Sequence, residues 1–305
     1  MTISAKIIAD SINPKGVRIT TFEVEYPRFI HAEVMTHRMF SRNSASSRAI
    51  PISKVIQQVN GTPASPVHWG KNQSGMQAKE ELVGPDKSFA KYLWDMAAQS
   101  AAKFAVDMSN VGLHKQVVNR ILEPFQIMKV IITATEWNNF WYLRDHEDAQ
   151  PEIQKLARVM KGEYDRSMPQ QLDYNMWHLP YIETRIVAAI DDKGKPTQHQ
   201  LYINPEGGFY TLDEAIQVSC SCCAQVSYRK LDTSLEKAKD IYKKLVESEP
   251  VHASAFEHVA LCSDPESEFY DEGWTHEDID NNAWSGNFRE WIQYRQTIPN
   301  NVKKG

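Results

Sequence analysis

The sequence predicts an α+β protein in which a mixed sheet packs against helices. Polar and apolar residues alternate within residues 17–35, as they do in a half-buried strand. Two turn sequences, at residues 191–194 and 204–208, are flanked by apolar runs, which is typical of β-hairpins. Apolar residues recur at helical spacing elsewhere, in residues 87–108, 149–164 and 234–248.

The composition limits the classes of function. A chain of 305 residues with 42% hydrophobic residues can bury the core of one large domain. The net charge of −5 argues against binding to a nucleic acid polymer, which depends on a basic surface. We find no run of the roughly 20 apolar residues that a membrane span requires, and no secretion signal at the start. We therefore expect a cytoplasmic protein without a membrane partner.

The N-terminal region is expected to contain two strands and a long loop. The alternation in residues 17–35 predicts a strand that leads into a polar loop, and the similar run at residues 3–9 is a suitable partner for it. Residues 60–88 are rich in Gly, Pro, Ser and Lys and show no periodicity. Loops of this length commonly act as lids.

The rest of the chain is expected to be mainly helical apart from the hairpin section. The helix at 87–108 is expected to stop near Gly112, and Pro151 suits the first turn of the helix at 149–164. The other expected elements are a helix at 114–122, a short buried segment at 128–135, an aromatic-rich helical segment at 136–143, hairpins within 166–212 and helices at 212–228 and 234–248.

Residues 36–48, which read THRMFSRNSASSR, are the most informative part of the chain. Arginine provides planar bidentate donors and serine provides short hydroxyl donors. A fixed loop with these groups can hold an anionic, nucleotide-like ligand. From composition alone, a basic and serine-rich surface loop is an equally good interpretation.

The four cysteines do not indicate a metal site. Cys220, Cys222 and Cys223 are crowded together and Cys262 lies far downstream. This spacing fits neither paired metal ligands nor a disulfide framework. We expect unreactive, packed thiols and no metal ion.

The same string resembles the signature R-H-R-x-x-S-x-N-E-x-S-x-R of the flavin-dependent thymidylate synthases, the ThyX family. Two positions depart from it, because Thr36 replaces an arginine and Ser44 replaces a glutamate. The positions that agree are His37, Arg38, Ser41, Asn43, Ser46 and Arg48.

The resemblance continues downstream. Residues 139–144, N-F-W-Y-L-R, and 149–153, A-Q-P-E-I, are similar to the family's N-F-x-x-L-R and A-Q-x-E-I segments. Arg120 resembles the arginine of its R-x-x-L-P segment, despite an apparent difference in local length. Residues 17–165 thus resemble the later two-thirds of the family order.

The first third of that order is found near the other end of the chain. Residues 224–228, A-Q-V-S-Y, are similar to the family's A-R-V-S-F, and residues 252–258, H-A-S-A-F-E-H, resemble its H-x-T/S-P-F-E-H. Residues 289–295 resemble a degraded copy of the family's R-Q-W-F-R-H-R, although chance similarity is the alternative.

We interpret the chain as one circularly permuted domain. Joining old ends and opening a new site is physically reasonable because domain termini usually lie at the surface and close together. In this interpretation the domain spans 1–305, with 1–165 as the later two-thirds, 166–212 as an inserted β-hairpin section, 213–262 as the first third and 263–305 as the degenerate second copy.

The resemblance implies two sets of site residues. Each arginine taken alone is more often part of a surface ion pair than a ligand contact. The implied flavin-site residues are His37, Arg38, Asn139, Ser227, His252, Ser254 and Glu257. The implied substrate-site residues are Glu33, Ser46, Ser47, Arg48, Arg120 and Arg144.

Within the substrate set, the residue types suit two tasks. Ser46, Arg48 and Arg120 can supply the charge-assisted donors that a 5′-phosphate requires. Arg144 is the implied catalytic residue, because a guanidinium near the pyrimidine can stabilise charge that develops on the ring.

The resemblance implies reductive methylation of dUMP to dTMP with FAD, methylenetetrahydrofolate and NADPH. Because members of the family are tetramers, it also implies that this chain forms a homo-oligomer. Glu33 stands where the family usually has glutamine and can accept a hydrogen bond from an exocyclic amine. Methylation or hydroxymethylation of dCMP or dUMP is therefore an alternative. A catalytically inactive nucleotide- or flavin-binding subunit is another.

Overall fold

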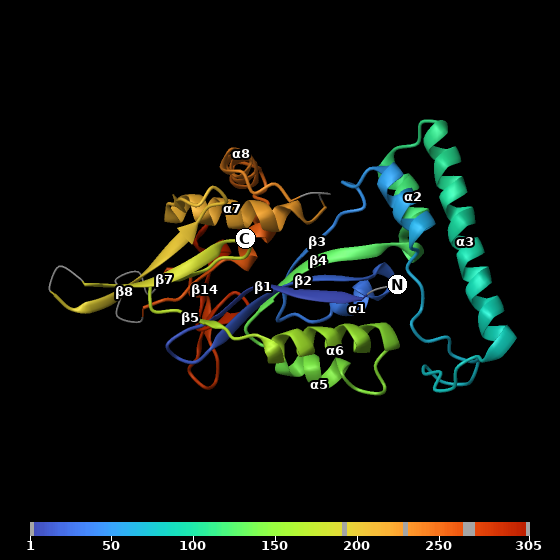
Figure 1. The fold of residues 1–305 in the computed structure, drawn as a ribbon, viewed down its shortest axis with the longest axis horizontal. Coiled ribbons are helices and arrows are strands. Elements are labelled where there is room, and N and C mark those ends of the chain that lie inside the picture. The colour runs from blue at the N-terminus through green and yellow to red at the C-terminus, as the bar shows by residue number, and fades with distance from the viewer. Residues whose placement is uncertain (1–2, 191–193, 228–230, 265–271, 303–305) are drawn as a thin grey trace.

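The computed structural model describes residues 3–190, 194–227, 231–264 and 272–302. It confirms the α+β class, with a central sheet that has helices on both sides and at one end (Figure 1). The helical periodicities are confirmed by α3 (Gly84–Asn110), α6 (Pro151–Arg166) and α8 (Leu235–Val246). Pro151 occupies the first turn of α6 as expected.

The central sheet has five strands in the order β3-β4-β2-β1-β5. All neighbours pair antiparallel except β1 and β5, which pair parallel, so the sheet is mixed. The expected partnership between the two N-terminal strands is confirmed. The strand bounds are β1 Ser4–Ile12, β2 Arg18–Pro27, β3 Ser41–Ser44, β4 Ile127–Ala134 and β5 Gln170–Gln171.

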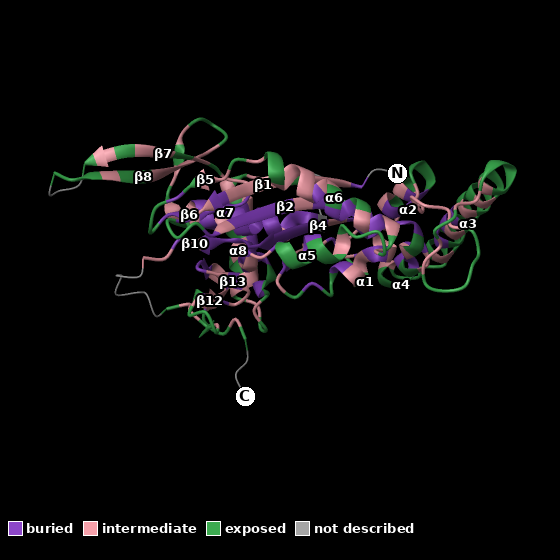
Figure 2. Ribbon diagram, turned by 90° about the horizontal axis from the view of Figure 1, so that it is seen from below, coloured by how far each residue is buried: buried purple, intermediate pink, exposed green. Residues whose placement is uncertain are grey.

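Alternation along β4 divides its side chains between the two faces of the sheet. Val130 and Ile132 join the main hydrophobic cluster, in which α6 contributes Leu156. Ile131 instead contacts Cys223 and the segment that follows α7 (Leu212–Ala224). Both faces are therefore covered, and the buried residues concentrate along the central strands (Figure 2).

A second cluster lies at one end of the sheet, between α2 (Ile52–Gly61), α3 and the 3-10 helix η2 (Asn119–Phe125). The inward face of α3 is lined by small residues, among them Ala98, Ala102 and Ala105. The other short helices are η1 Arg28–Ile30, α1 His31–Val34, α4 Lys115–Val118 and α5 Asn138–Arg144, of which α5 contacts α6.

The hairpin section is confirmed by β7, β8 and β9, which form a three-stranded antiparallel sheet. Residues 191–193 of the first turn lie outside the described residues. In the second turn, Asn204 Oδ1 accepts hydrogen bonds from the backbone N–H groups of Glu206 (3.1 Å) and Gly208 (2.8 Å). The strand bounds are β7 Glu183–Ile190, β8 Pro196–Ile203 and β9 Phe209–Tyr210.

Two small sheets and two 3-10 helices complete the fold. One sheet joins β6, β10 and β14, and the other joins β11, β12 and β13. Their bounds are β6 Trp177–His178, β10 Ala260–Leu261, β11 His276–Glu277, β12 Ala283–Ser285, β13 Phe288–Arg289 and β14 Ile292–Gln293. The 3-10 helices η4 (Ala253–His258) and η5 (Tyr294–Thr297) lie in this region.

Several boundaries differ from the sequence predictions. The strand predicted at 17–35 ends at Pro27, because its ladder with β4 ends there and the chain turns into η1 and α1. The helix predicted at 114–122 is split into α4 and η2, which contains Pro124. The helix predicted at 212–228 ends at Ala224 and continues as η3 (Gln225–Ser227), whereas Tyr228 lies outside the described residues.

The four cysteines are buried and form no disulfide with one another. Burial raises the pKa of both Cys222 and Cys262 to about 12. Their thiols are therefore protonated and poorly nucleophilic at neutral pH.

Among the described residues, none of the helices has the length and apolarity that crossing a bilayer demands.

Candidate functional site

Residues 36–48 are not the continuous loop that was expected, because Ser41–Ser44 form the edge strand β3 against β4. Arg42 donates hydrogen bonds to the carbonyl oxygens of Met35 (2.7 Å) and His37 (3.2 Å), at the end of α1. Asn43 Nδ2 donates to the Cys223 carbonyl (2.6 Å), which ties the strand to α7. These side chains fix the position of the motif.

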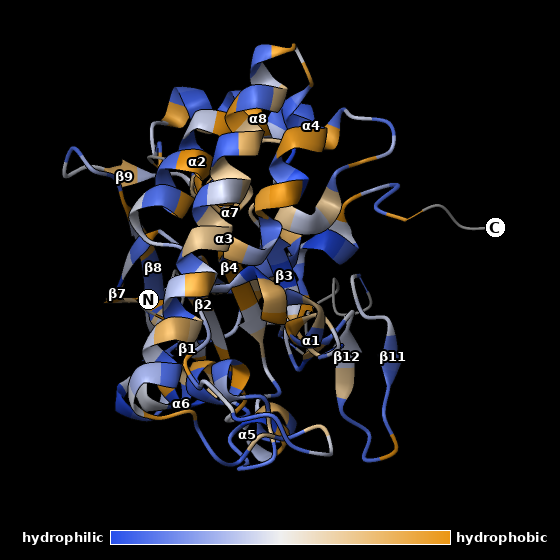
Figure 3. Ribbon diagram, turned by 90° about the vertical axis from the view of Figure 1, so that its right-hand side faces the viewer, coloured by the Kyte–Doolittle hydropathy of each residue, from blue (hydrophilic) through white to orange (hydrophobic). Residues whose placement is uncertain are grey.

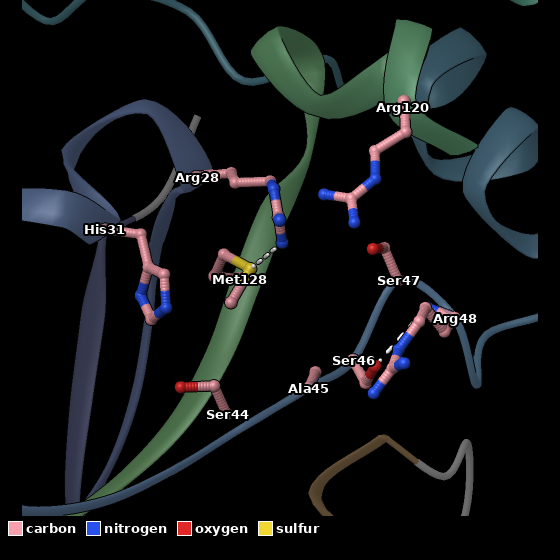
Figure 4. A pocket seen from close by; sticks show the side chains of 9 residues that line it. All are labelled: Arg28, His31, Ser44, Ala45, Ser46, Ser47, Arg48, Arg120 and Met128. Carbon is pink, nitrogen blue, oxygen red and sulfur yellow. Dashed lines mark hydrogen bonds between the residues drawn. The ribbon is translucent and has the colours of Figure 1, made fainter. Parts of the chain in front are cut away.

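The turn after β3 borders a cavity of about 280 Å³, which we call the arginine cavity. Ser46, Ser47 and Arg48 come from this turn, Arg120 comes from η2, and Arg28 is the first residue of η1, directly after β2. Figure 4 shows the Arg28 and Arg120 guanidinium groups and the Ser47 hydroxyl converging on one region. The full lining is Arg28, His31, Ser44, Ala45, Ser46, Ser47, Arg48, Arg120 and Met128.

Glu123 holds two of these arginines. Its Oε1 accepts hydrogen bonds from Arg28 Nη2 (2.9 Å), Arg120 Nη1 (3.0 Å) and Ser47 Oγ (3.5 Å). Glu123 is not among the residues that line the cavity. The carboxylate therefore restrains the guanidinium groups from outside the space that a ligand can occupy.

His31 adds an uncharged polar group to the same cavity. Its Nδ1 lies 2.9 Å from the Tyr26 hydroxyl. Burial lowers the pKa of His31, and the nearby Arg28 and Arg42 lower it further. At neutral pH the imidazole is therefore neutral, and the positive charge of the cavity comes from its arginines.

A second cavity of about 290 Å³ lies between the start of the motif and α5; we call it the His37 cavity. Phe140 and Trp141 are buried in the main core, and Phe140 borders the cavity together with Asn139, Leu143 and Arg144 of the same short helix. The lining combines Thr36, His37, Arg38, Met39, Phe40, Glu136, Asn139, Phe140, Leu143 and Arg144.

Arg144 is held in this cavity by three side chains. Its Nε donates to His37 Nε2 (2.9 Å), its Nη1 lies 3.3 Å from Glu33 Oε2, and its Nη2 donates to Thr36 Oγ1 (3.4 Å). Burial, followed by the charges of Arg144 and Arg42, lowers the pKa of His37 to about 4. Since Nε2 accepts from an arginine, His37 is neutral and carries its proton on Nδ1.

The segment at residues 252–258 lies outside both cavities but packs against the motif strand. Helix η4 contacts β3 and β4, and His258 Nδ1 lies 2.8 Å from Thr133 Oγ1 of β4. His252 and Ser254 are exposed on this helix. Glu257 forms an ion pair with Arg295. The two halves of the chain therefore meet at β3.

The Glu257 carboxyl responds to opposing influences. Burial raises its pKa, whereas Arg295 and Arg42 act to lower it, and the net direction is upward.

Ser227 ends η3, and its side chain lies outside the described residues.

The structure groups the implied residues differently from the two sets expected. Ser46, Ser47, Arg48 and Arg120 share the arginine cavity. Glu33 and Arg144 form an ion pair beside His37, so two members of the implied substrate set lie with the implied flavin set.

Arg28, His31 and Glu123 belong to the arginine cavity or its support, although no sequence motif indicated them. The only local signals were Arg28 directly after Pro27 and Glu123 directly before Pro124. Arg28 and Glu123 are 95 positions apart, and no periodicity links them.

Residues 18–170, half of the chain, match the family model described as thymidylate synthase complementing protein. This range includes the motif, Arg120 and Arg144, and excludes residues 224–258. No curated protein matches the chain.

Similar solved structures include the UMP/dUMP methylase PolB from Streptomyces cacaoi, in two complexes. The complex with 5-Br dUMP has 15% identity, covers 54% of this chain and 90% of that chain, and gives a TM-score of 0.44. The match to the complex with 5-Br UMP has 14% identity, covers 54% of this chain and 89% of that chain, and gives a TM-score of 0.45.

Proposed function

The chain belongs to the thymidylate synthase complementing protein family, and on that basis we propose that it methylates C5 of dUMP to give dTMP. Methylenetetrahydrofolate is the proposed one-carbon donor, FAD the cofactor and NADPH the reductant. The observation that carries the proposal is the fixed position of Arg144, held by Glu33 and His37 at a cavity within the matched residues.

The His37 cavity has a composition that fits a flavin. Arg38 offers a cationic donor for phosphate, and Asn139 offers an amide that can pair with ring heteroatoms. Phe140 and Leu143 add apolar surface. Once NADPH has reduced it, bound FAD would supply the hydride that completes the new methyl group. We propose that Ser227, His252, Ser254 and Glu257 extend this site, since η4 packs against β3.

Arg144 is the proposed catalytic residue. Its guanidinium is oriented by a neutral imidazole and a carboxylate, so its remaining N–H donors are fixed before substrate arrives. Preorganised donors stabilise negative charge that develops in a transition state. We propose that Arg144 stabilises charge on the pyrimidine ring while C5 attacks the one-carbon unit.

The arginine cavity is the proposed site for the 5′-phosphate. Arg48 and Arg120 provide charge-assisted donors, and Ser46 and Ser47 line the same cavity with hydroxyl groups. Neither arginine needs a change of backbone conformation to reach a ligand in this cavity, because both already line it.

We propose that a second copy of the chain completes the site. The arginine cavity and the His37 cavity share no lining residue among the described residues. The outward face of α3 offers a contact surface, since Phe89 and Leu93 are 61% and 51% exposed. Figure 3 shows that α3 contains both hydrophobic and hydrophilic positions along its length. Apolar surface of this kind favours association, in keeping with a homo-oligomer such as a tetramer.

Circular permutation remains our interpretation of the sequence order. Contact of η4 with β3 supports it, because the resemblance to the family implies that both segments belong to one flavin site. A separate contact, between η5 and η4, joins Arg295, in the region interpreted as a degenerate second copy, to Glu257.

A pyrimidine with an exocyclic amine is the second candidate substrate. Glu33 uses Oε2 to contact Arg144, and its carboxylate has a further oxygen that can accept from the amine of dCMP. Hydroxymethyl transfer is a further variant of this candidate.

Product mass after incubation of the purified protein with methylenetetrahydrofolate, NADPH and either dUMP or dCMP tests these proposals. We expect dTMP from dUMP. Turnover of dCMP alone would contradict the first proposal and support the second, whereas a gain of a hydroxymethyl group would identify hydroxymethyl transfer. A colourless protein that ignores added FAD and forms no product would indicate an inactive subunit.

A further inference from the structure

We propose that Arg28 is an additional ligand of the substrate's phosphate. This inference rests on the proposed function, because it assigns one more residue to the nucleotide site. Arg28 is the first residue of η1, directly after β2, and lies outside the segments whose similarity to the family implied site residues.

The backbone fixes where Arg28 begins. The ring of Pro27 fixes the backbone φ angle of the residue directly before Arg28. The Arg28 N–H donates a hydrogen bond to the Gln126 carbonyl (2.8 Å). The Arg28 side chain is only 18% exposed and borders the arginine cavity. A guanidinium that is already ordered loses little further conformational entropy when it binds an anion.

One edge of the Arg28 guanidinium is poorly satisfied. Nη2 donates to the Glu123 carboxylate at 2.9 Å, whereas Nη1 donates to Met128 Sδ at 2.9 Å. A thioether is a weak acceptor. Met128 also lines the cavity, so a phosphate oxygen there can replace a weak interaction with a charge-assisted hydrogen bond.

The charge of the cavity also favours this role. Arg28, Arg48 and Arg120 contribute three positive charges, and Glu123 contributes one negative charge, which leaves a net charge of +2. His31 adds none while it is neutral. A phosphate monoester carries close to −2 above its second pKa of about 6. Without Arg28 the balance falls to +1, which leaves part of the ligand charge uncompensated.

A purely structural role for Arg28 is the alternative, since its pair with Glu123 joins the end of β2 to η2. Arg18 is a suitable control. It lies at the other end of β2, pairs with Asp10 at 2.6 Å, and has a side chain that is 17% exposed. It borders neither of the two cavities.

Calorimetric titration of the purified protein tests the proposal without requiring turnover. The ligands are dUMP and deoxyuridine, which lacks the phosphate, or dCMP and deoxycytidine if the protein prefers them. We expect Arg28→Met to weaken nucleotide binding by about 10- to 100-fold, the effect of losing a hydrogen bond to a charged group. Nucleoside binding and the Arg18→Met variant are expected to stay within about 3-fold of wild type.

Arg28→Lys provides a second variant in case the methionine variant does not fold. It keeps the charge but loses the planar fork, and we expect an intermediate loss of nucleotide affinity with unchanged nucleoside affinity. If either folded Arg28 variant binds the nucleotide with wild-type affinity, the proposal that Arg28 is a phosphate ligand is overturned, whereas the proposed function is not. A wild-type protein that binds neither dUMP nor dCMP would overturn the proposed function as well.

Discussion

The protonation state of His37 determines how Arg144 is held. A charged imidazole can no longer accept from the guanidinium, so the observed contact at 2.9 Å requires the neutral ring. Burial and two nearby arginines favour that neutral form by lowering the pKa of His37 to about 4. The site thus keeps an arginine and a histidine in contact at neutral pH without charge repulsion.

Replacing Arg144 with alanine is expected to lower kcat by at least about 100-fold, because a preorganised donor is lost. The variant should retain bound flavin, which the absorbance of the purified protein reports. Arg158→Ala is the matched control, since Arg158 forms an exposed ion pair with Asp145. Turnover that is equal in the two variants would show that the role assigned to Arg144 is wrong.

Two other histidines belong to a buried chain of hydroxyl and imidazole groups. His178 contacts Ser11 and Thr21, and His258 contacts Thr133, with separations of 2.8 to 2.9 Å. Burial lowers the pKa of each histidine to about 3. Both rings are therefore neutral structural groups in the folded protein.

The free energy of unfolding is expected to fall as the pH falls below about 6.5. The unfolded chain then binds protons that His178 and His258 do not bind in the fold until the pH approaches 3. The expected slope is about 1.4 kcal/mol per pH unit for each histidine. Urea unfolding at several pH values measures it.

The variant His178→Asn should flatten this dependence relative to wild type. The variant His146→Gln changes an exposed histidine and should leave it unaltered. If the free energy of unfolding depends on pH equally in wild type and His178→Asn, then His178 does not cause the loss of stability at low pH.

At the scale of elements, the motif strand β3 depends on a segment near the other end of the chain. Gln293 of β14 is buried, and its Nε2 lies 3.0 Å from Ser41 Oγ and 2.9 Å from Asn287 Oδ1. Ser41 therefore serves the packing of β3 rather than either cavity. This polar contact links the N-terminal motif to the C-terminal segment.

Replacing Gln293 with leucine is expected to lower the free energy of unfolding by about 1 to 3 kcal/mol, because buried polar partners lose their hydrogen bonds. Urea unfolding gives the value. Gln99→Ala, an exposed change on α3, is the control and should stay within about 0.5 kcal/mol of wild type. If Gln293→Leu also stays within about 0.5 kcal/mol of wild type, the hydrogen bonds of Gln293 contribute little to the free energy of unfolding.

At the scale of the whole molecule, α3 projects along one end of the fold (Figure 1) and has two unlike faces. Ala98 and Ala102 pack inward against α2 and η2, whereas Phe89, Leu93 and Phe104 are exposed. Helical spacing places these exposed residues on one side. Such a face is costly to leave in water and suits a contact between copies of the chain.

The double variant Phe89→Glu and Leu93→Glu is expected to shift the protein toward monomers, because it places charges on that apolar face. Sedimentation velocity reports the change in mass. Gln99→Glu adds a charge at an exposed polar position of the same helix and should leave the assembly intact. A wild-type protein that is monomeric at micromolar concentration would contradict the homo-oligomer.

The α+β class, most helices and strands, and the types of donor group in residues 36–48 can be predicted from the sequence. These depend on local periodicity, turn residues and side-chain type, which are properties of neighbouring positions. The substrate role predicted for Ser46, Ser47, Arg48 and Arg120 stays a prediction, and these four residues line one cavity.

The contact of Arg144 with His37 and the restraint of Arg28 by Glu123 are visible only in the folded chain. Strand order and register bring these residues together, and both are set by packing across the whole sheet. No local pattern contains that information, because burial on the two faces of β4 involves segments from both ends of the chain.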